Sequence, residues 1–246
     1  MRYLILSDLH ANWEGLAAVM ESVEGRYDRI VCCGDLIGYG ADPNPVVEWT
    51  RANVALVVRG NHDRACTGLD DLEWFNPVAR AAATWTQQQL TPENADYVRA
   101  LPKGPLMAGG FAMMHGSPMD EDQYVVEARD AAPVFSYLEA PVAFFGHTHL
   151  QGGFVWIRQR ARQLRLPAEG PDAGVLELDP ECAYLLNPGS AGQPRDGDPR
   201  AACIVYEPEE RIVRFHRVTY DVATAQNKSR RAGLPQVLAD RLSVGR

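Results

Sequence analysis

The chain has 246 residues and a formal net charge of −8, from 24 basic and 32 acidic residues. This acidic balance argues against non-specific binding of nucleic acid, which depends on neutralising phosphates. Hydrophobic residues make up 46% of the chain, enough for a substantial core, yet no apolar run approaches the roughly 20 residues of a membrane span. The N-terminus lacks signal-peptide features and the five cysteines show no disulfide framework, so we expect a cytoplasmic protein that acts away from membranes.

In the first part of the chain, short apolar runs alternate with segments of helical spacing. The runs are bounded by polar residues and predict buried strands, at 3–6, 30–33, 54–58, 111–114 and 142–145. Helical spacing predicts a helix at 13–24, which Gly25 ends. Prolines open three further predicted helices, at 45–52, 77–90 and 92–100.

After residue 150 the pattern changes to strands with few helices between them. These strands are predicted at 154–157, 175–178, 183–186, 201–206 and 212–218. A parallel α/β half is thus followed by a more antiparallel half, and we prefer one domain with two packed sheets. The basic segment 158–170 is expected to be an exposed hairpin tip or a mobile loop. We expect a main domain at 1–220 and a tail at 221–246 with two short helices, separated at Gly233.

Five polar clusters follow five of the predicted strands. They are Asp8-Leu9-His10, Gly34-Asp35, Gly60-Asn61-His62-Asp63, His115-Gly116 and Gly146-His147-Thr148-His149. Ligands bind at the carboxyl ends of the strands in open α/β sheets, so we expect these clusters to meet at one edge. His147 and His149 are two residues apart, as are Asp8 and His10. In extended backbone each pair would face one metal site.

The residue types in the clusters indicate a divalent metal site. Carboxylate, imidazole and amide ligands together suit Mn²⁺, Fe²⁺ or Zn²⁺, whereas a structural zinc site would favour closely spaced cysteines. Five of the six histidines fall in the clusters, and the sixth, His216, is read as an ordinary strand residue. One His-x-His alone is more often structural than catalytic, but five clusters together favour a functional metal centre. Glycines precede Asp35, Asn61 and His147, where we expect sharp backbone turns.

The order of these motifs over residues 4–149 resembles that of the calcineurin-like metallophosphoesterases. The segment 187–198 resembles the bacterial and archaeal branch of that superfamily related to diadenosine tetraphosphatases. The resemblance implies an α/β fold, a four-layer α/β/β/α sandwich of two mixed sheets flanked by helices, with two divalent metal ions between the sheets. It also implies which residues bind these ions: Asp8, His10 and His149 the first, Asn61, His115 and His147 the second, and Asp35 both.

The implied roles agree with general chemistry. A bridging ligand needs two acceptor oxygens, which Asp35 offers and a histidine does not. Two ions about 3.5–4 Å apart can share a hydroxide and clamp a phosphate for in-line displacement. By resemblance, His62 faces the substrate phosphate instead of a metal, and Asp63 orients His62 through a hydrogen bond.

Three further residues are candidate substrate contacts, each with a structural alternative. Asn12 caps the first helix or helps that helix hold phosphate. Tyr39 stacks on a nucleobase or packs within its loop. Arg195 lies in the turn-rich segment 187–198, which we expect to approach the metal site, and either contacts phosphate or pairs with Asp196 or Asp198.

We therefore predict a metal-dependent phosphoesterase, a phosphatase or phosphodiesterase that acts on a small phosphodiester or a nucleotide. The acidic charge allows this, because bound metal ions set the local field. Phosphoprotein phosphatases of the superfamily carry Asp-Arg-Gly where this chain has Gly38-Tyr39-Gly40, and Glu where it has Asp63. A phosphoprotein phosphatase and a non-catalytic metal-binding scaffold or interaction module remain the alternatives. Retention of His62 beside all the candidate ligands favours the enzyme.

Overall fold

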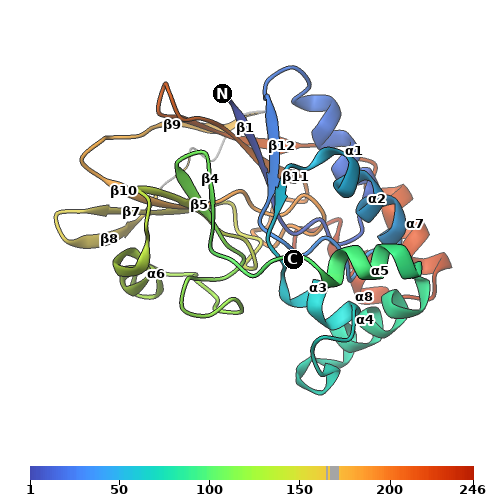
Figure 1. Cartoon of the computed structure of the whole chain (residues 1–246). Helices are drawn as coiled ribbons and strands as arrows, with labels where there is room; N and C mark the ends of the chain where they lie inside the picture. Colours follow the sequence, from blue (N-terminus) through green and yellow to red (C-terminus); the bar gives the residue numbers. More distant parts are fainter. Residues whose placement is uncertain (165, 167–171) are drawn as a thin grey trace.

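The computed structural model describes residues 1–164, 166 and 172–246. Two six-stranded sheets pack face to face, with helices on their outer sides (Figure 1). In order across the first sheet, the strands are β3 (Leu56–Val57), β2 (Arg29–Cys32), β1 (Tyr3–Leu6), β11 (Ala201–Glu207), β12 (Ile212–Val218) and β9 (Asp172–Glu177). In the second sheet they are β4 (Leu106–Ala108), β5 (Phe111–Met113), β6 (Val142–Phe144), β10 (Ala183–Asn187), β7 (Gly152–Ile157) and β8 (Arg160–Gln163).

Both sheets are mixed, as expected. Strands β1, β2 and β3 run parallel to one another, and so do β5, β6 and β10, whereas all other neighbouring strands pair antiparallel. We expected a parallel first half of the chain and a more antiparallel second half, but each sheet contains strands from both halves. Strands β4–β6 of the first half belong to the second sheet, and β9, β11 and β12 of the second half complete the first.

Helices cover the sheets from both sides. They are α1 (Trp13–Ser22), α2 (Pro43–Asn53), α3 (Asn61–Cys66), α4 (Pro77–Gln89), α5 (Pro92–Arg99), α6 (Ala128–Val134), α7 (Val222–Arg231) and α8 (Gln236–Arg241), with 3₁₀ turns η1 (Leu72–Trp74) and η2 (Phe135–Tyr137). Prolines occupy the first turn of α2, α4 and α5, as the sequence predicted. Helices α3 and α6 were not predicted. Each is shorter than two full helical turns, which is too short for a helical spacing of apolar residues to be recognised in the sequence.

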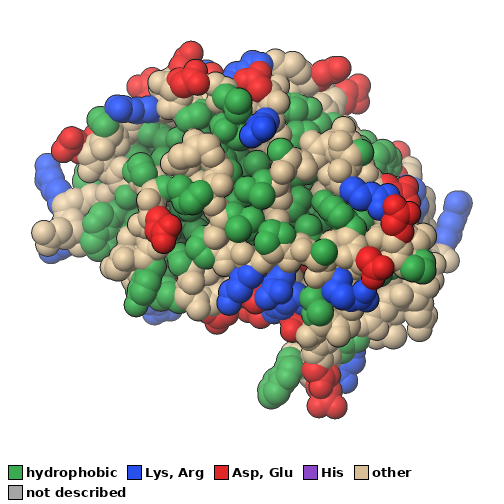
Figure 2. Space-filling model, viewed as in Figure 1, with side chains coloured by type: hydrophobic (Ala, Val, Ile, Leu, Met, Phe, Trp, Pro, Cys, Tyr) green, Lys and Arg blue, Asp and Glu red, His purple; other side chains and the backbone are tan. Residues whose placement is uncertain are grey.

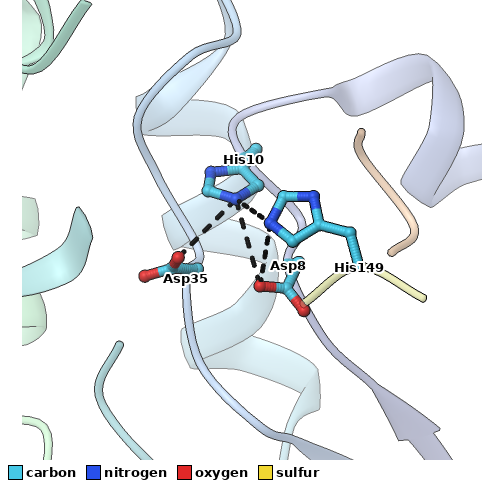
Figure 3. A group of neighbouring side chains, drawn as sticks. All are labelled: Asp8, His10, Asp35 and His149. Atoms are coloured by element: carbon cyan, nitrogen blue, oxygen red, sulfur yellow. Dashed lines mark hydrogen bonds and ion pairs between the residues drawn. The ribbon is translucent and has the colours of Figure 1, made fainter. Parts of the chain in front are cut away.

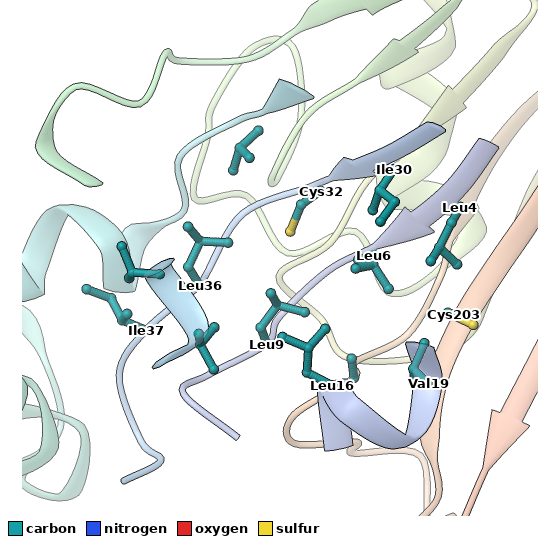
Figure 4. Packing of buried hydrophobic residues seen from close by; sticks show 14 of the residues in the cluster. Leu4, Leu6, Leu9, Leu16, Val19, Ile30, Cys32, Leu36, Ile37 and Cys203 are labelled. Atoms are coloured by element: carbon teal, nitrogen blue, oxygen red, sulfur yellow. The ribbon is translucent and has the colours of Figure 1, made fainter. Parts of the chain in front are cut away.

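Alternation along the strands creates the layers. On β1, Leu4 and Leu6 pack among the buried residues under α1, as Figure 4 shows, whereas Tyr3 and Ile5 belong to the core between the two sheets. Helix α6 covers a third apolar cluster on the far side of the second sheet. Each fully buried leucine contributes roughly 1.5–3 kcal/mol by leaving water. This arrangement is the expected four-layer α/β/β/α sandwich.

The C-terminal tail forms the two expected helices, α7 and α8. Leu234 and Leu238 pack against Tyr39 and helix α4, and Lys228 bonds to Glu14 and Asp42. The tail therefore lies against the loop that follows β2. The boundary at residue 220 stays a prediction, because the packing alone does not divide the chain.

Part of the basic segment 158–170 is a hairpin between β7 and β8, with Arg158 and Gln159 at its tip. Residues 165 and 167–171, to which the prediction also applied, lie outside the described residues. Within the described ranges, no helix has both the length and the apolarity needed to cross a membrane. On the face seen in Figure 2, acidic and basic side chains are interspersed.

Candidate metal centre

The five clusters follow strands of both sheets. Those of the first sheet follow β1, β2 and β3, and those of the second follow β5 and β6. The expected meeting at one edge is therefore wrong in detail, because the carboxyl ends of two sheets, not one, deliver the side chains. The site lies where these two sheet ends face each other.

One group of side chains unites Asp8, His10, Asp35 and His149, all buried. The Nε2 atoms of His10 and His149 lie 3.1 Å apart and point toward each other (Figure 3). The Oδ1 atom of Asp8 lies 3.3 Å from Nε2 of His149, and Oδ2 of Asp35 lies 3.6 Å from Nε2 of His10. Four ligand atoms thus surround one small volume.

A second group unites Asp35, His115 and His147. Nε2 of His115 lies 3.4 Å from Oδ2 of Asp35 and 3.1 Å from Nδ1 of His147. The side-chain oxygen of Asn61 lies 3.3 Å from the same Nε2. Asp35 belongs to both groups, so its carboxylate lies between two potential ion positions.

Three of the histidines are oriented by backbone carbonyl oxygens on their outer sides. The Nδ1 atoms of His10, His115 and His149 lie 3.1, 2.8 and 2.6 Å from the oxygens of Ile37, Cys33 and Gln193. An N–H donated to a carbonyl fixes the tautomer in which Nε2 presents its lone pair to the site. This is the protonation state that a metal ligand requires.

The ligand atoms fit divalent cations better than they fit one another. Two Nε2 lone pairs 3.1 Å apart, those of His10 and His149, repel unless a cation or a shared proton lies between them. The Nδ1 atom of His147 and the Nε2 atom of His115 are crowded in the same way, at 3.1 Å. Carboxylate and imidazole together match borderline divalent ions, so the donor set fits the expected metals.

Backbone conformation also marks the site. Positive φ angles occur at Asp8, His10, Asp35, His147 and His149, between 45° and 64°. Such angles cost of the order of 1–3 kcal/mol per residue and persist only where the surrounding structure imposes them. Strain at five candidate ligands is typical of a functional site.

The positive φ angles correct one inference from spacing. Asp8 and His10 do face the same ion position, but His147 and His149 divide between the two groups. The spacing argument assumed extended backbone, in which residues two apart share a side, and neither histidine is extended. The division agrees with what the family resemblance implied.

The glycines near the site act in two ways. Gly34 has a φ of +98°, so it permits the expected sharp turn before Asp35. Gly60 has an ordinary φ of −105°, and its importance is steric. A Cβ atom there would lie 2.0 Å from Oδ1 of Asp35. Gly60 therefore allows the carboxylate of Asp35 to approach the backbone.

His62 and Asp63 begin helix α3 beside the two groups. The ring of His62 packs between Tyr39 and Phe75, with centroids 4.2 and 5.2 Å away. Its Nδ1 atom is buried, and no described residue forms a hydrogen bond with the imidazole. The implied bond from Asp63 to His62 is therefore wrong.

Asp63 instead holds the backbone around Asp35. Its carboxylate accepts hydrogen bonds from the N–H groups of Asp35 and Leu36, each 2.9 Å away, and of Gly60 at 3.0 Å. Because Asp63 lies at the first turn of a helix that follows β3, its side chain points back to the neighbouring loop after β2. Asp63 positions Asp35, not His62.

The charges of the site favour ligation. Burial raises the pKa of Asp35, but the charges of His115 and other histidines outweigh it and hold that pKa well below its usual range. Burial lowers the pKa of His147 to about 3 and that of His10 well below the ordinary value. Burial also lowers the pKa of His115, but Asp35 and Asp8 raise it to about 10. The carboxylates that attract a proton to His115 would equally attract a divalent ion at this position.

Of the three candidate substrate contacts, Asn12 and Tyr39 have structural partners. Asn12 caps α1 through Gly15 and donates to the oxygen of Gly192 at 2.7 Å. Tyr39 is 8% exposed and packs against the ring of His10. The structure thus gives both residues the structural role that the sequence left open.

Arg195 approaches the site from the segment 187–198, as expected. Strand β10 pairs with β6, and the backbone of Arg195 bonds to the oxygen of His149. Its guanidinium carbon lies 5.6 Å from the centroid of the Tyr39 ring. The expected alternative, an ion pair with Asp196 or Asp198, is wrong, because those carboxylates pair with Arg217 and Arg200.

Sequence reasoning missed a cleft beside the second group. The cleft has a volume of about 460 Å³ and reaches Asn61 and His147. Tyr124 lies on the ring of His147, with centroids 4.0 Å apart, and Trp74 is 90% exposed at the mouth. Trp74 is the last residue of η1. No sequence motif near Trp74 or Tyr124 indicated that these two aromatic residues lie beside the site.

The chain is similar to known proteins over most of its length. The model of the calcineurin-like phosphoesterase superfamily domain matches residues 1–210. An uncharacterized protein of Methanocaldococcus jannaschii is 32% identical over 247 residues, which cover 98% of this chain and 97% of that protein. A solved metallophosphoesterase from Sphaerobacter thermophilus is 40% identical, with a TM-score of 0.85 over 100% of this chain and 99% of that one. A hypothetical protein from Pyrococcus horikoshii OT3, 17% identical, has a TM-score of 0.80 over 100% and 98% of the two chains. This last likeness concerns the fold alone.

Proposed function

This chain belongs to the calcineurin-like phosphoesterase superfamily, and we propose that it hydrolyses a phosphoester bond with two divalent ions bridged by Asp35. The observation that carries the proposal is the membership of Asp35 in both groups of potential ligands. A carboxylate has the two acceptor oxygens that a shared position requires.

The remaining ligands divide around that bridge. In the proposal Asp8, His10 and His149 hold one ion, and Asn61, His115 and His147 hold the other. When bound, Mn²⁺, Fe²⁺ or Zn²⁺ would activate water and neutralise the phosphate charge. Ser7 donates to Oδ2 of Asp8 at 2.6 Å, which orients that ligand.

His62 is the proposed catalytic residue outside the ligand set. Tyr39 and Phe75 hold its ring, and its N–H is available to donate to a phosphate oxygen or to the leaving oxygen. A positioned donor of this kind typically contributes a factor of about 10²–10⁴ to the rate. Asp63 acts as a positioning residue, because it anchors the backbone that carries Asp35.

We propose a small phosphodiester or a nucleotide as the substrate. The cleft beside Asn61 and His147 supports this choice, because Trp74 and Tyr124 offer aromatic faces at its wall. Aromatic side chains stack favourably on flat rings such as nucleobases. The resemblance of segment 187–198 to a branch related to diadenosine tetraphosphatases agrees with a nucleotide.

Hydrolysis by the Mn²⁺-loaded protein tests the proposal. Bis-p-nitrophenyl phosphate, p-nitrophenyl phosphate, cyclic nucleotides and a dinucleoside polyphosphate would be compared before and after chelation. We expect turnover of at least one diester or nucleotide, its loss on chelation and its recovery with Mn²⁺. Metal binding without turnover of any phosphoester would instead favour the scaffold.

A further inference from the structure

Two arginines near the proposed metal centre have no acidic partner. Arg195 lies in the segment 187–198, and Arg241 is the last residue of α8. Within the described part of the chain, no carboxylate forms an ion pair with either guanidinium. The nearby carboxylates pair elsewhere, since Asp198 bonds to Arg200 and Asp240 bonds to Arg230.

Both arginines also bury a polar atom that lacks a partner. The Nε atoms of Arg195 and Arg241 are shielded from solvent and have no hydrogen-bond acceptor among the described residues. Arg195 uses one terminal nitrogen on the side-chain oxygen of Gln193, at 3.2 Å. A charged N–H that is buried without an acceptor is costly, and two of them in one place call for an anion.

Arg195 and α8 meet at Tyr39, because the guanidinium carbon of Arg195 lies 5.6 Å from the centroid of that ring and Leu238 of α8 packs against it. Burial lowers the pKa of Arg241, the charge of Arg195 lowers it further, and Tyr39 raises it. Leu238 of α8 and Leu242, which follows the helix, line a small cavity that His10 and Tyr39 also line, so this end of α8 rests beside the site.

The end of the chain is fastened to the segment that carries Arg195. The N–H of Gly197 donates to the oxygen of Gly245 at 2.9 Å. The residues that follow α8 are therefore held against the segment that carries Arg195. Like charges held together without an anion are typical of a site that binds an anionic ligand.

We propose that Arg195 and Arg241 form a second anion site, which binds a further phosphate group of a substrate whose first phosphate lies at the metal centre. Arg195 lies over the Tyr39 ring, and that ring is 4.6 Å from the ring of His10 and 4.2 Å from that of His62. Arg195 therefore adjoins the ligands proposed for the first ion, and the helix that carries Arg241 packs on the same tyrosine through Leu238. The substrate class is then a nucleoside or dinucleoside polyphosphate. A simple phosphodiester has only one phosphate and would leave this second site empty.

This inference rests on the proposed function, and two esters with one leaving group test it. The p-nitrophenyl esters of thymidine monophosphate and of thymidine triphosphate differ only in the number of phosphates. Arg241→Gln and Arg195→Gln should each lower the ratio of the two kcat/KM values, triphosphate over monophosphate, by about 10-fold or more. Arg231→Gln is the matched control, an exposed arginine on α7, and should leave the ratio within about twofold.

An unchanged ratio in Arg241→Gln would overturn the proposal, and so would an equal loss with both esters, because the arginines would then serve the phosphate at the metals. Arg241→Lys guards against a folding defect. It keeps the charge but not the planar fork, so an intermediate ratio supports the proposal. A melting temperature that falls in both Arg241 variants while the ratio holds would make Arg241 a structural residue.

Calorimetric titration of the chelator-treated full chain with inorganic tripolyphosphate gives a readout independent of turnover. We expect one site that weakens at least about 10-fold in Arg195→Gln and Arg241→Gln, and not in Arg231→Gln. Equal affinity in all four proteins would refute the anion site. If the wild type hydrolyses neither ester but the titration behaves as expected, the proposed phosphoesterase fails while the anion site stands.

Discussion

Replacing Gly60 by alanine should displace the carboxylate and the backbone of Asp35. The added Cβ would lie 2.0 Å from Oδ1 and 2.6 Å from the backbone nitrogen of Asp35, whereas contacts below 3.0 Å essentially do not occur, so the carboxylate must retreat by about 1 Å. The same Oδ1 accepts the N–H of His62 at 2.9 Å, and that bond would stretch or break. Overpacking of this size costs about 1–3 kcal/mol of stability.

The effect on the metal centre should exceed the effect on stability. A displacement of about 1 Å in a catalytic group lowers the rate by about 10²-fold, and changes to groups that orient ligands lower metal affinity by about 10–100-fold. Urea unfolding of the chelated protein, Mn²⁺ titration by calorimetry and kcat/KM with bis-p-nitrophenyl phosphate would measure the three quantities. Metal affinity and turnover in Gly60→Ala within twofold of wild type would refute the reasoning.

Gly110→Ala is the matched control for this prediction. Gly110 lies in the exposed turn between β4 and β5 with a φ of +94°, and no atom lies within 4 Å of an added Cβ. The variant should lose about 1 kcal/mol to backbone strain and keep its metal affinity. The pair thus separates a general loss of stability from displacement of Asp35.

Two further predictions concern the chemistry and the substrate. His62→Gln should keep near-native metal content and lose about 10²–10⁴-fold in turnover; a collapse of metal content in the folded variant would assign His62 to the ligands. Small phosphodiesters or nucleotides should be hydrolysed more efficiently than a phosphopeptide, since the chain lacks Asp-Arg-Gly at 38–40; activity on the phosphopeptide alone would reverse that assignment.

The family, the layers and most elements could be predicted because their signals are local. Strand β12 and the start of helix α1 agree with the prediction to the residue, and the capping asparagine before α1 is visible in the sequence. The calcineurin-like superfamily assignment is confirmed by the family model over residues 1–210. The motifs that support this assignment are short and lie at strand ends, where the loops need particular residues to place their side chains in the site.

Properties that depend on backbone strain could not be predicted. His147 and His149 look like a pair that shares one side, and only their positive φ angles separate them. Asp63 looks like a partner for the adjacent His62, but the helix start turns its carboxylate toward the backbone of Asp35. Spacing arguments assume regular backbone, and strained sites depart from it.

Contacts between distant segments were also beyond sequence reasoning. Arg241 lies in a short amphipathic tail with no motif, and its proximity to Arg195 follows from the packing of Leu238 against Tyr39. Trp74 reaches the cleft from the short 3₁₀ turn η1 and Tyr124 from an irregular segment, and no periodicity in the sequence defines either path. Such residues require the fold before their role can be inferred.

The measurement that tests the central claim most directly is a Mn²⁺ titration of the chelated protein, with bound metal and phosphodiester turnover followed together, for wild type and Asp35→Asn. We expect two ions per chain in the wild type, with turnover that rises as both sites fill. In Asp35→Asn, both sites should weaken and turnover should be lost, because the shared carboxylate serves both ions. Full turnover in demonstrably metal-free protein, or an Asp35→Asn variant that keeps two tightly bound ions, would contradict it.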